Sequence, residues 1–82
     1  MPLKTIHIQY YALLREESGV SKEDVSTSAL TAAELYQELK NKYNFKLSMG
    51  LFKVAINNQF SDWATKLNDG DSVVFIPPVA GG

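Results

Sequence analysis

The sequence lacks cysteine altogether, has one histidine and one tryptophan, and carries little excess charge of either sign. Because there is no cysteine, the chain has no disulfide, no thiolate nucleophile and no Cys-ligated zinc. The formal net charge is −1, and the eight Lys and Arg are spread between Lys4 and Lys66, which does not predict a basic nucleic-acid-binding surface. No apolar run approaches the length of a membrane span. We therefore expect neither nucleic acid nor a membrane among the partners.

The chain is also poorly supplied for independent catalysis. His7, the one histidine, lies in the middle of a strand pattern, where a half-exposed structural role is the default. There are no paired carboxylates at an evident cleft, no phosphate-binding loop and no metal-ligand spacing. Residues 1–11 alternate in polarity and do not predict a signal peptide. These features favour a cytoplasmic carrier or binding partner with no metal or cofactor of its own and no independent activity.

Hydrophobic periodicity divides the 82 residues into the short elements of one domain, 1–82. Strict alternation indicates half-buried strands, and a spacing of three and four residues indicates the main helix, which Thr31 and Glu34 begin with a capping box. Gly19 ends a shorter helix. In chain order the expected elements are a strand at 3–11, a short helix at 12–18, a weak and short strand at 22–28, a helix at 31–43, a strand at 51–57, a short strand at 60–63 and a strand at 72–76.

This order of elements predicts an α+β fold of the β-grasp type, the ubiquitin-like architecture. A mixed sheet of four to five strands is expected, covered on one face by the main helix, with the short helix beside it. The first and last strands are the most apolar and are expected in the interior of the sheet. Residues 77–82 follow the last strand as a flexible functional tail.

The last strand is expected to present one of its two faces to a partner. Because side chains alternate along a strand, Val73 and Phe75 share one face, and Val74 and Ile76 share the other. If the helix covers the first pair, the second pair lies on an open face, and an exposed apolar patch on a small domain usually marks a partner site. The residues expected to form this partner site are Tyr11, Phe60, Val74 and Ile76, with Arg15 as a further contact.

The six C-terminal residues are the most informative segment of the chain. They are Pro77, Pro78, Val79, Ala80, Gly81 and Gly82. The two prolines cannot continue a sheet ladder and stiffen the exit of the chain, while the two glycines can enter a channel too narrow for a side chain. Fully extended, six residues reach about 20 Å. Such a segment is either a frayed end or a tail that carries its terminal carboxylate into another protein, and its rigid attachment to a strand favours the second reading.

Three segments resemble one known family. YYALLREESG at 10–19 resembles the family's aromatic and A-x-x-RE-x-x-G element after the first strand, and LFKVAINNQF at 51–60 resembles its hydrophobic strand followed by V-N-x. LNDGDSVVFIPPVAGG at 67–82 resembles its L-x-DGD-x-V-x-F-x-PPV-x-GG terminus, the most specific of the three. The chain thus resembles the small subunits of molybdopterin synthase, which are sulfur carriers. Residues 20–30 match little, and we expect surface variation there.

The resemblance implies a chemistry in which the Gly82 carboxylate is the functional group. A separate adenylating enzyme uses ATP and magnesium to form an acyl-adenylate at Gly82, and a sulfur donor then replaces AMP to give a thiocarboxylate. The tail enters the large subunit of molybdopterin synthase, where its sulfur attacks cyclic pyranopterin monophosphate. The resemblance also implies assembly as a heterotetramer, in which this chain donates sulfur and the partner supplies orientation and electrostatics.

Three alternatives remain open at this point. A thiamine-pathway sulfur carrier uses the same tail chemistry, but such proteins are usually shorter and lack the ALLREESG segment and the Pro-Pro spacer. A ubiquitin-like modifier would join its terminal glycine to lysines of other proteins. A plain interaction domain would lose no activity on removal of Gly82.

Overall fold

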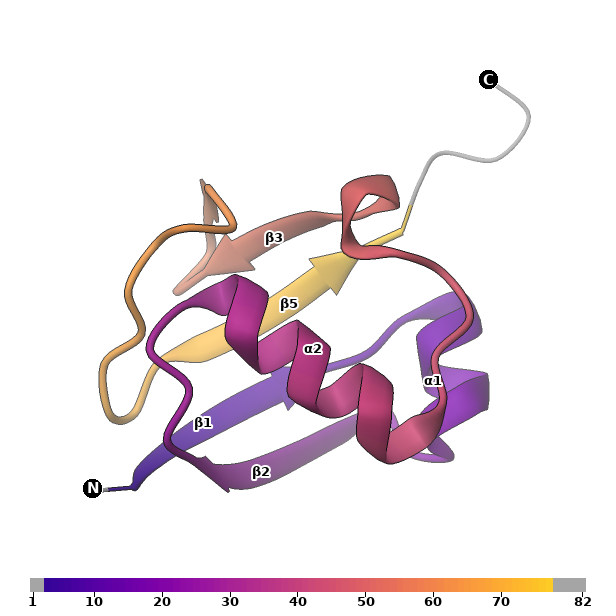
Figure 1. Cartoon of the computed structure of the whole chain (residues 1–82), viewed down its shortest axis with the longest axis horizontal. Helices are drawn as coiled ribbons and strands as arrows, with labels where there is room; N and C mark the ends of the chain where they lie inside the picture. The colour runs from indigo at the N-terminus through magenta and orange to yellow at the C-terminus, as the bar shows by residue number, and fades with distance from the viewer. Residues whose placement is uncertain (1–2, 78–82) are drawn as a thin grey trace.

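The computed structural model describes residues 3–77, and Figure 1 shows one curved sheet crossed by helix α2. The five strands lie in the order β2-β1-β5-β3-β4, with β1 and β5 parallel and the other neighbouring pairs antiparallel. This confirms the predicted α+β fold of the β-grasp type, with β1 and β5 inside the sheet. The elements are β1 (Lys4–Gln9), α1 (Ala12–Ser18), β2 (Lys22–Thr27), α2 (Ala32–Tyr43), the 3-10 helix η1 (Met49–Leu51), β3 (Lys53–Ile56), β4 (Gln59–Ser61) and β5 (Ser72–Ile76).

Helix α2 begins at its predicted cap and is tied there to the loop before β5. Thr31 Oγ1 accepts a hydrogen bond from Glu34 N at 3.2 Å, as a capping box requires. The Glu34 carboxylate accepts from Leu30 N at 3.1 Å, one residue earlier than the predicted box. The first two helical N–H groups donate to the backbone carbonyls of Thr65 and Trp63, at 3.1 and 2.9 Å. The loop and the Thr31 side chain together therefore satisfy the donors that a helix start leaves unpaired.

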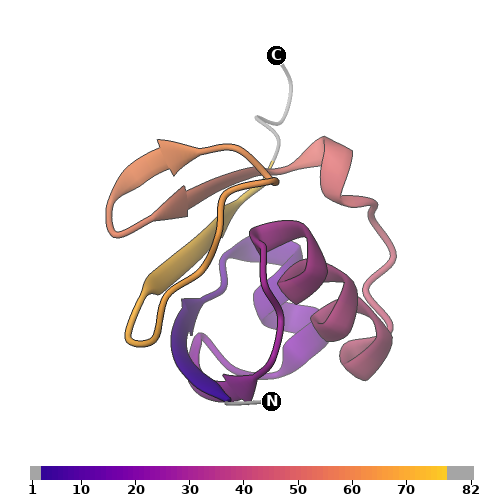
Figure 2. The ribbon, with the colours of Figure 1, turned by 60° about the vertical axis from the view of Figure 1, so that its left-hand side comes forward.

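The core lies between α2 and the inner face of the sheet, as the turned view in Figure 2 shows. Alternate residues of β1 and β5 point into it, and Tyr36 of α2 packs its ring against Phe75 with centroids 5.3 Å apart. Burying each aliphatic side chain here contributes about 1.5–3 kcal/mol to folding before entropy is counted. The largest fully buried apolar side chains are Tyr10, Tyr36, Phe75, Ile6, Ile8, Leu14, Leu35, Leu39, Val54 and Val73.

A partly buried carboxylate joins the sheet to the last turn of α2. Glu23 of β2 accepts hydrogen bonds from the hydroxyls of Tyr10 at 2.5 Å and Tyr43 at 2.7 Å. Lys42 Nζ lies 3.9 Å from the same carboxylate. Burial, followed by these hydrogen bonds, raises the pKa of Tyr10 and of Tyr43 above the usual phenol value. The sequence gives no local signal for this cluster, because its members lie up to 33 positions apart, on β2, on α2 and in the segment between β1 and α1.

Polar turn residues fix where β5 begins. Asn57 and Asn58 have φ values of 52° and 68°, which gives the two-residue turn that joins β3 to β4. The Asn57 side chain then reaches across to the last strand: its Nδ2 donates to Asp71 Oδ1 at 2.9 Å, and its Oδ1 accepts from Ser72 N at 3.0 Å. The chain turns just before β5 at Gly70, whose φ is 87°.

The structure corrects the predictions for four strands, and the first of these is β4, which spans Gln59–Ser61 rather than 60–63. Strand β3 begins at Lys53 rather than at 51, because the N–H groups of Leu51 and Phe52 donate within η1, to Ser48 O and Met49 O. Strand β1 ends at Gln9 because the chain turns there into α1. The prediction of a weak and short second strand was wrong: β2 has six residues, like β1, and pairs with it along its whole length.

Candidate functional site

The face of the sheet opposite α2 is covered by no helix in the part of the chain that the structure describes (Figure 2). On this outer face Gln9 pairs with Val74, Val74 with Ala55, and Ala55 with Phe60. Side chains of directly paired residues point to the same side of a sheet. The four residues therefore form a row across β1, β5, β3 and β4, which we call the outer row. Sequence reasoning missed Gln9 and Ala55 because the row depends on strand register.

Phe60 is the prominent member of the outer row. Its side chain is 76% exposed, more than any other large apolar residue of 3–77. Ala55, next to it in the row, is buried at 9% exposure, and Val74 beyond Ala55 is half-buried. Covering the Phe60 ring with a partner would release about 2 kcal/mol of hydrophobic free energy. The row therefore has the composition of a docking surface, with an aromatic anchor at one end.

The predicted tail begins where the outer face ends. Ile76 follows Val74 on the same face, pairs with Lys53 and is half-buried, as is Pro77 after it. Figures 1 and 2 both show the end of β5 beside η1, whose Met49 and Leu51 are exposed. A partner that receives the tail must lie against this end of the sheet. The other predicted tail residues, Pro78, Val79, Ala80, Gly81 and Gly82, lie outside the described residues.

The two predicted contacts near α1 have different surroundings. Tyr11 is 43% exposed, and its extended backbone (φ −127°, ψ 156°) continues the alternation of β1, so its side chain follows Gln9 on the outer side. Ala12 then turns the chain with φ 49°. Arg15 is exposed on α1 and forms no ion pair with the described residues. No hydrogen bond or ion pair among residues 3–77 joins the Arg15 side chain to the outer row, and its role in binding stays a prediction.

The other half of the outer face is polar. His7 Nδ1 and Asp24 Oδ1, from paired positions of β1 and β2, lie 2.7 Å apart, with both side chains about half exposed or more. They line a shallow hollow together with Lys22, Asn58 and Ser72. His7 thus occupies the half-exposed strand position that the sequence predicts. Two ligand side chains do not make a metal site, and residues 3–77 contain no group of three His, Cys, Asp or Glu that could hold one.

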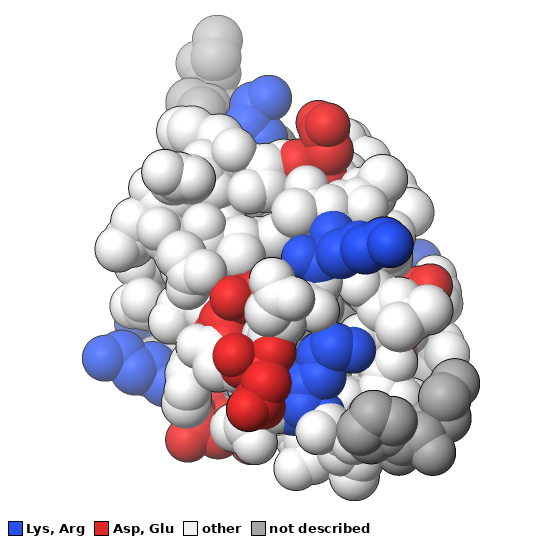
Figure 3. All heavy atoms as spheres, turned by 90° about the vertical axis from the view of Figure 1, so that its left-hand side faces the viewer, with Lys and Arg blue, Asp and Glu red and all other residues white. Residues whose placement is uncertain are grey.

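Charge is mixed on the face of the molecule that Figure 3 shows. Figure 3 shows Lys and Arg side chains interspersed with Asp and Glu on the face in view, without a single large basic area. Such a surface favours docking through apolar contacts over binding to a polyanion. Neither α1 nor α2, the α-helices described here, has the length and hydrophobicity to cross a bilayer.

The ThiS family matches residues 8–82. The molybdopterin synthase sulfur carrier subunit of Escherichia coli (strain K12) is 30% identical over 80 residues, which cover 94% of this chain and 99% of that protein. The counterpart from Mycobacterium tuberculosis is 31% identical over the same share of this chain and 96% of its own.

Solved structures agree in fold. A complex of subunits 1 and 2 of the molybdopterin-converting factor from Helicobacter pylori 26695 contains a chain with 28% identity and a TM-score of 0.64, covering 95% of this chain and 99% of that one. The small archaeal modifier protein 1 of Methanosarcina acetivorans, at 21% identity and a TM-score of 0.78 with full coverage of both chains, shows the same fold. The chain therefore belongs to the ThiS family and is similar to sulfur carrier subunits of molybdopterin synthase.

Proposed function

We propose that this chain is the sulfur carrier subunit of a molybdopterin synthase, and that the carboxylate of Gly82 carries the sulfur. The observation that supports the proposal best is the similarity to a sulfur carrier subunit over 94% of this chain and 99% of the relative. An exposed apolar face that ends at Pro77 is the surface such a tail needs for docking. A cytoplasmic location and assembly as a heterotetramer belong to the same proposal.

The chemistry begins with activation of an unreactive group. A carboxylate is a poor electrophile, because its charge is delocalised and it offers no good leaving group. We propose that an adenylating enzyme transfers AMP from ATP, with magnesium, to the Gly82 carboxylate and releases pyrophosphate. A sulfide donor displaces AMP and gives the thiocarboxylate –COS⁻ directly. A persulfide donor displaces AMP to give an acyl disulfide, and a thiol reductant then cleaves its S–S bond to release the same thiocarboxylate.

The second stage takes place in the partner. The thiocarboxylate sulfur attacks cyclic pyranopterin monophosphate bound by the large subunit, and hydrolysis of the acyl group returns the Gly82 carboxylate. Two such transfers build the dithiolene that binds molybdenum. This chain supplies the reacting atom, whereas the large subunit supplies orientation and electrostatic stabilisation, which are the larger contributions to rate. We assign no general base to residues 3–77.

If the large subunit and the adenylating enzyme dock on the same face, they cannot bind this chain at the same time. The large subunit and the adenylating enzyme each need the tail in their own active site, and each therefore has to cover the end of β5 and the outer row. We propose that both use Phe60, Val74 and Ile76, with Tyr11 beside them, so that one must leave before the other binds. The molecule that accepts the sulfur distinguishes this proposal from the thiamine-pathway alternative. Only a molybdopterin synthase subunit supports sulfur transfer to the pyranopterin.

Intact-mass analysis of the chain made together with its adenylating enzyme tests the proposal. The expected result is a mass increase equal to the replacement of one oxygen by sulfur, lost when Gly82 is deleted. An unchanged mass in the presence of active adenylating enzyme, ATP and a sulfur donor contradicts it. The modifier alternative is tested by deleting the large subunit and searching for conjugates to lysine.

A further inference from the structure

We propose that a hollow at the free edge of β3 receives an apolar side chain of the synthase large subunit and extends the docking surface around the edge of the sheet. This inference rests on the proposed function. We call the hollow the edge notch, and it is lined by Gly50, Phe52, Lys53, Val54, Phe60, Ser61, Asp62 and Trp63.

The edge notch exists because β4 is too short to cover β3. Strand β4 pairs only with Val54, Ala55 and Ile56, whereas β5 on the other side pairs with Lys53 as well. Within residues 3–77, Lys53 therefore has a strand neighbour on one side only. An uncovered strand edge next to an apolar hollow is a common attachment point for a partner segment.

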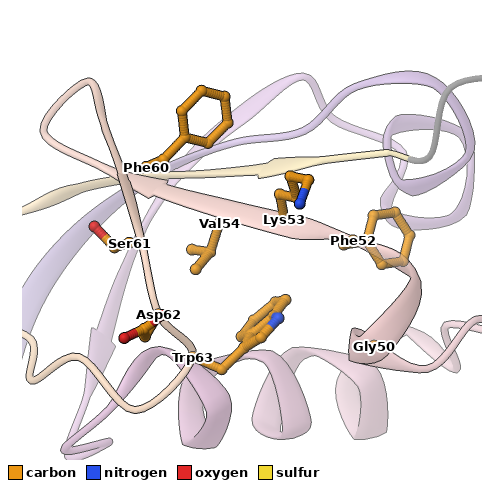
Figure 4. A pocket seen from close by; sticks show the side chains of 8 residues that line it. All are labelled: Gly50, Phe52, Lys53, Val54, Phe60, Ser61, Asp62 and Trp63. Carbon is orange, nitrogen blue, oxygen red and sulfur yellow. The ribbon is translucent and has the colours of Figure 1, made fainter.

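The floor of the edge notch is apolar and its rim is polar. Figure 4 shows Val54 and Trp63 pointing toward one another across the hollow, with Ser61 and Asp62 on one side and Phe52 and Gly50 on the other. Val54 and Phe52 are buried, at 1% and 4% exposure. The hollow has a volume of about 520 Å³, ample for one large side chain. Apolar pockets surrounded by polar groups are the sites that hold binding anchors in interfaces.

The wall formed by Trp63 is held in place before any partner arrives. Its ring stacks on Phe75 with centroids 5.8 Å apart and an interplanar angle of 11°, and its edge meets Tyr36 at 5.6 Å. Its carbonyl accepts the second helical N–H of α2 at 2.9 Å. A pocket with fixed walls loses little side-chain entropy when it is filled. The edge notch is therefore a preformed receptor rather than a gap that must open.

The edge notch is continuous with the proposed docking face. The protein that covers this face, the large subunit, is therefore the one expected to fill the edge notch. Phe60 belongs both to the outer row and to the rim, and Figure 4 shows Phe60 and Lys53 pointing to the opposite side of β3 from Trp63. Lys53 also pairs with Ile76, at the end of β5. A protein that covers the outer row and takes in the tail must pass over this rim. The large subunit is the partner that a relative of this chain is seen to bind, in the Helicobacter pylori complex.

Gly50 allows the edge notch to be filled without disturbing the core. A Cβ built at Gly50 meets nothing within 4 Å, and its φ lies outside the left-handed region, so a side chain is tolerated there. We expect Gly50→Phe to weaken binding of the unmodified chain to the large subunit about tenfold, measured by titration calorimetry. Gln37→Phe adds the same ring to the exposed side of α2 and is expected to bind within about twofold of the parent chain. Thermal unfolding of both variants checks that the fold is kept.

The sole tryptophan gives a second, direct readout. With 5-fluorotryptophan incorporated, Trp63 is the one labelled position, and its fluorine resonance is expected to shift when the large subunit binds. If Gly50→Phe binds like the parent chain and the resonance does not move, the edge notch is not an anchor site, while the proposed function stands. If the parent chain itself does not bind the large subunit, both the edge notch and the proposed function are wrong.

Discussion

At the scale of single residues, the backbone of Ala12 is held in an unfavourable conformation. Its φ of 49° lies in the left-handed region, which costs a residue with a Cβ about 1–2 kcal/mol. Buried neighbours on both sides, Tyr10 and Leu14, fix the path of the chain and force the turn. Gly at this position in place of Ala removes the steric cost, although it adds entropy to the unfolded chain.

We therefore expect Ala12→Gly to raise the free energy of unfolding by about 0.5–1 kcal/mol in urea denaturation. Ala33→Gly is the matched control, because Ala33 lies in regular helix α2, and it is expected to lower the free energy by about the same amount. Equal losses of stability in both variants would show that the backbone at Ala12 is not strained.

Tyrosine side chains also make the stability of the fold depend on pH in the alkaline range. The Tyr36 hydroxyl donates to Leu47 O at 2.6 Å, and burial raises its pKa from 10.0 to about 12. A group whose pKa is raised by folding holds its proton more tightly in the folded state. Its contribution to stability is therefore complete below pH 10 and is lost as the pH rises from 10 toward 12. The shift of the Tyr10 pKa acts in the same direction.

We expect the free energy of unfolding to change little between about pH 8 and 9 and to fall steeply above about pH 10. In Tyr36→Phe the fall is expected to be shallower, although the variant is less stable near neutral pH because Leu47 O loses its donor. Chemical denaturation at a series of pH values measures both effects. The same alkaline slope in the variant and the parent chain would contradict the assignment to Tyr36.

At the scale of secondary-structure elements, the parallel pairing of β1 with β5 and the short β4 decide what the outer face presents. Pairing across β4, β3 and β5 places Phe60 in one row with Val74, although the two lie 14 positions apart in sequence. The Asn57-Asn58 turn brings β4 back alongside β3 in the sheet, with Phe60 on the exposed outer face. An apolar side chain that stays exposed to water in this way is typical of a surface that a partner covers.

We expect Phe60→Ser to weaken binding to both the large subunit and the adenylating enzyme about tenfold, while the free energy of unfolding changes by less than about 0.5 kcal/mol. Leu30→Ser is the matched control: Leu30 is 55% exposed but lies in the loop before α2, away from the outer row, and binding is expected to be unchanged. Surface plasmon resonance with each partner measures the affinities. Parallel effects of the two substitutions would show that the outer row has no special role.

At the scale of the whole molecule, local sequence patterns predict structural features that depend on residues close together in sequence. They miss features that depend on the pairing of strands far apart in sequence. The bounds of α1 are predicted because Gly19 ends it, and the start of α2 because Thr31 caps it. The start of β3 is missed because a 3-10 turn competes for the same backbone donors. Alternation along the last strand predicts that Val74 and Ile76 share one face. The inclusion of Gln9 and Ala55 in the outer row depends on strand register, and the Glu23 cluster and the edge notch depend on strand pairing and strand length, which no local pattern carries. The terminal motif, in contrast, is contiguous, so the family could be identified from sequence.

The central claim is that the terminal carboxyl group of Gly82 carries the sulfur. The most direct measurement compares molybdopterin formation by the parent chain and by a variant with one serine added after Gly82, each supplied with adenylating enzyme, sulfur donor and large subunit. The account predicts product from the parent chain and none from the extended variant, whose mass also shows no sulfur. Product formation by the extended variant, recovered with its serine still attached, would contradict the account.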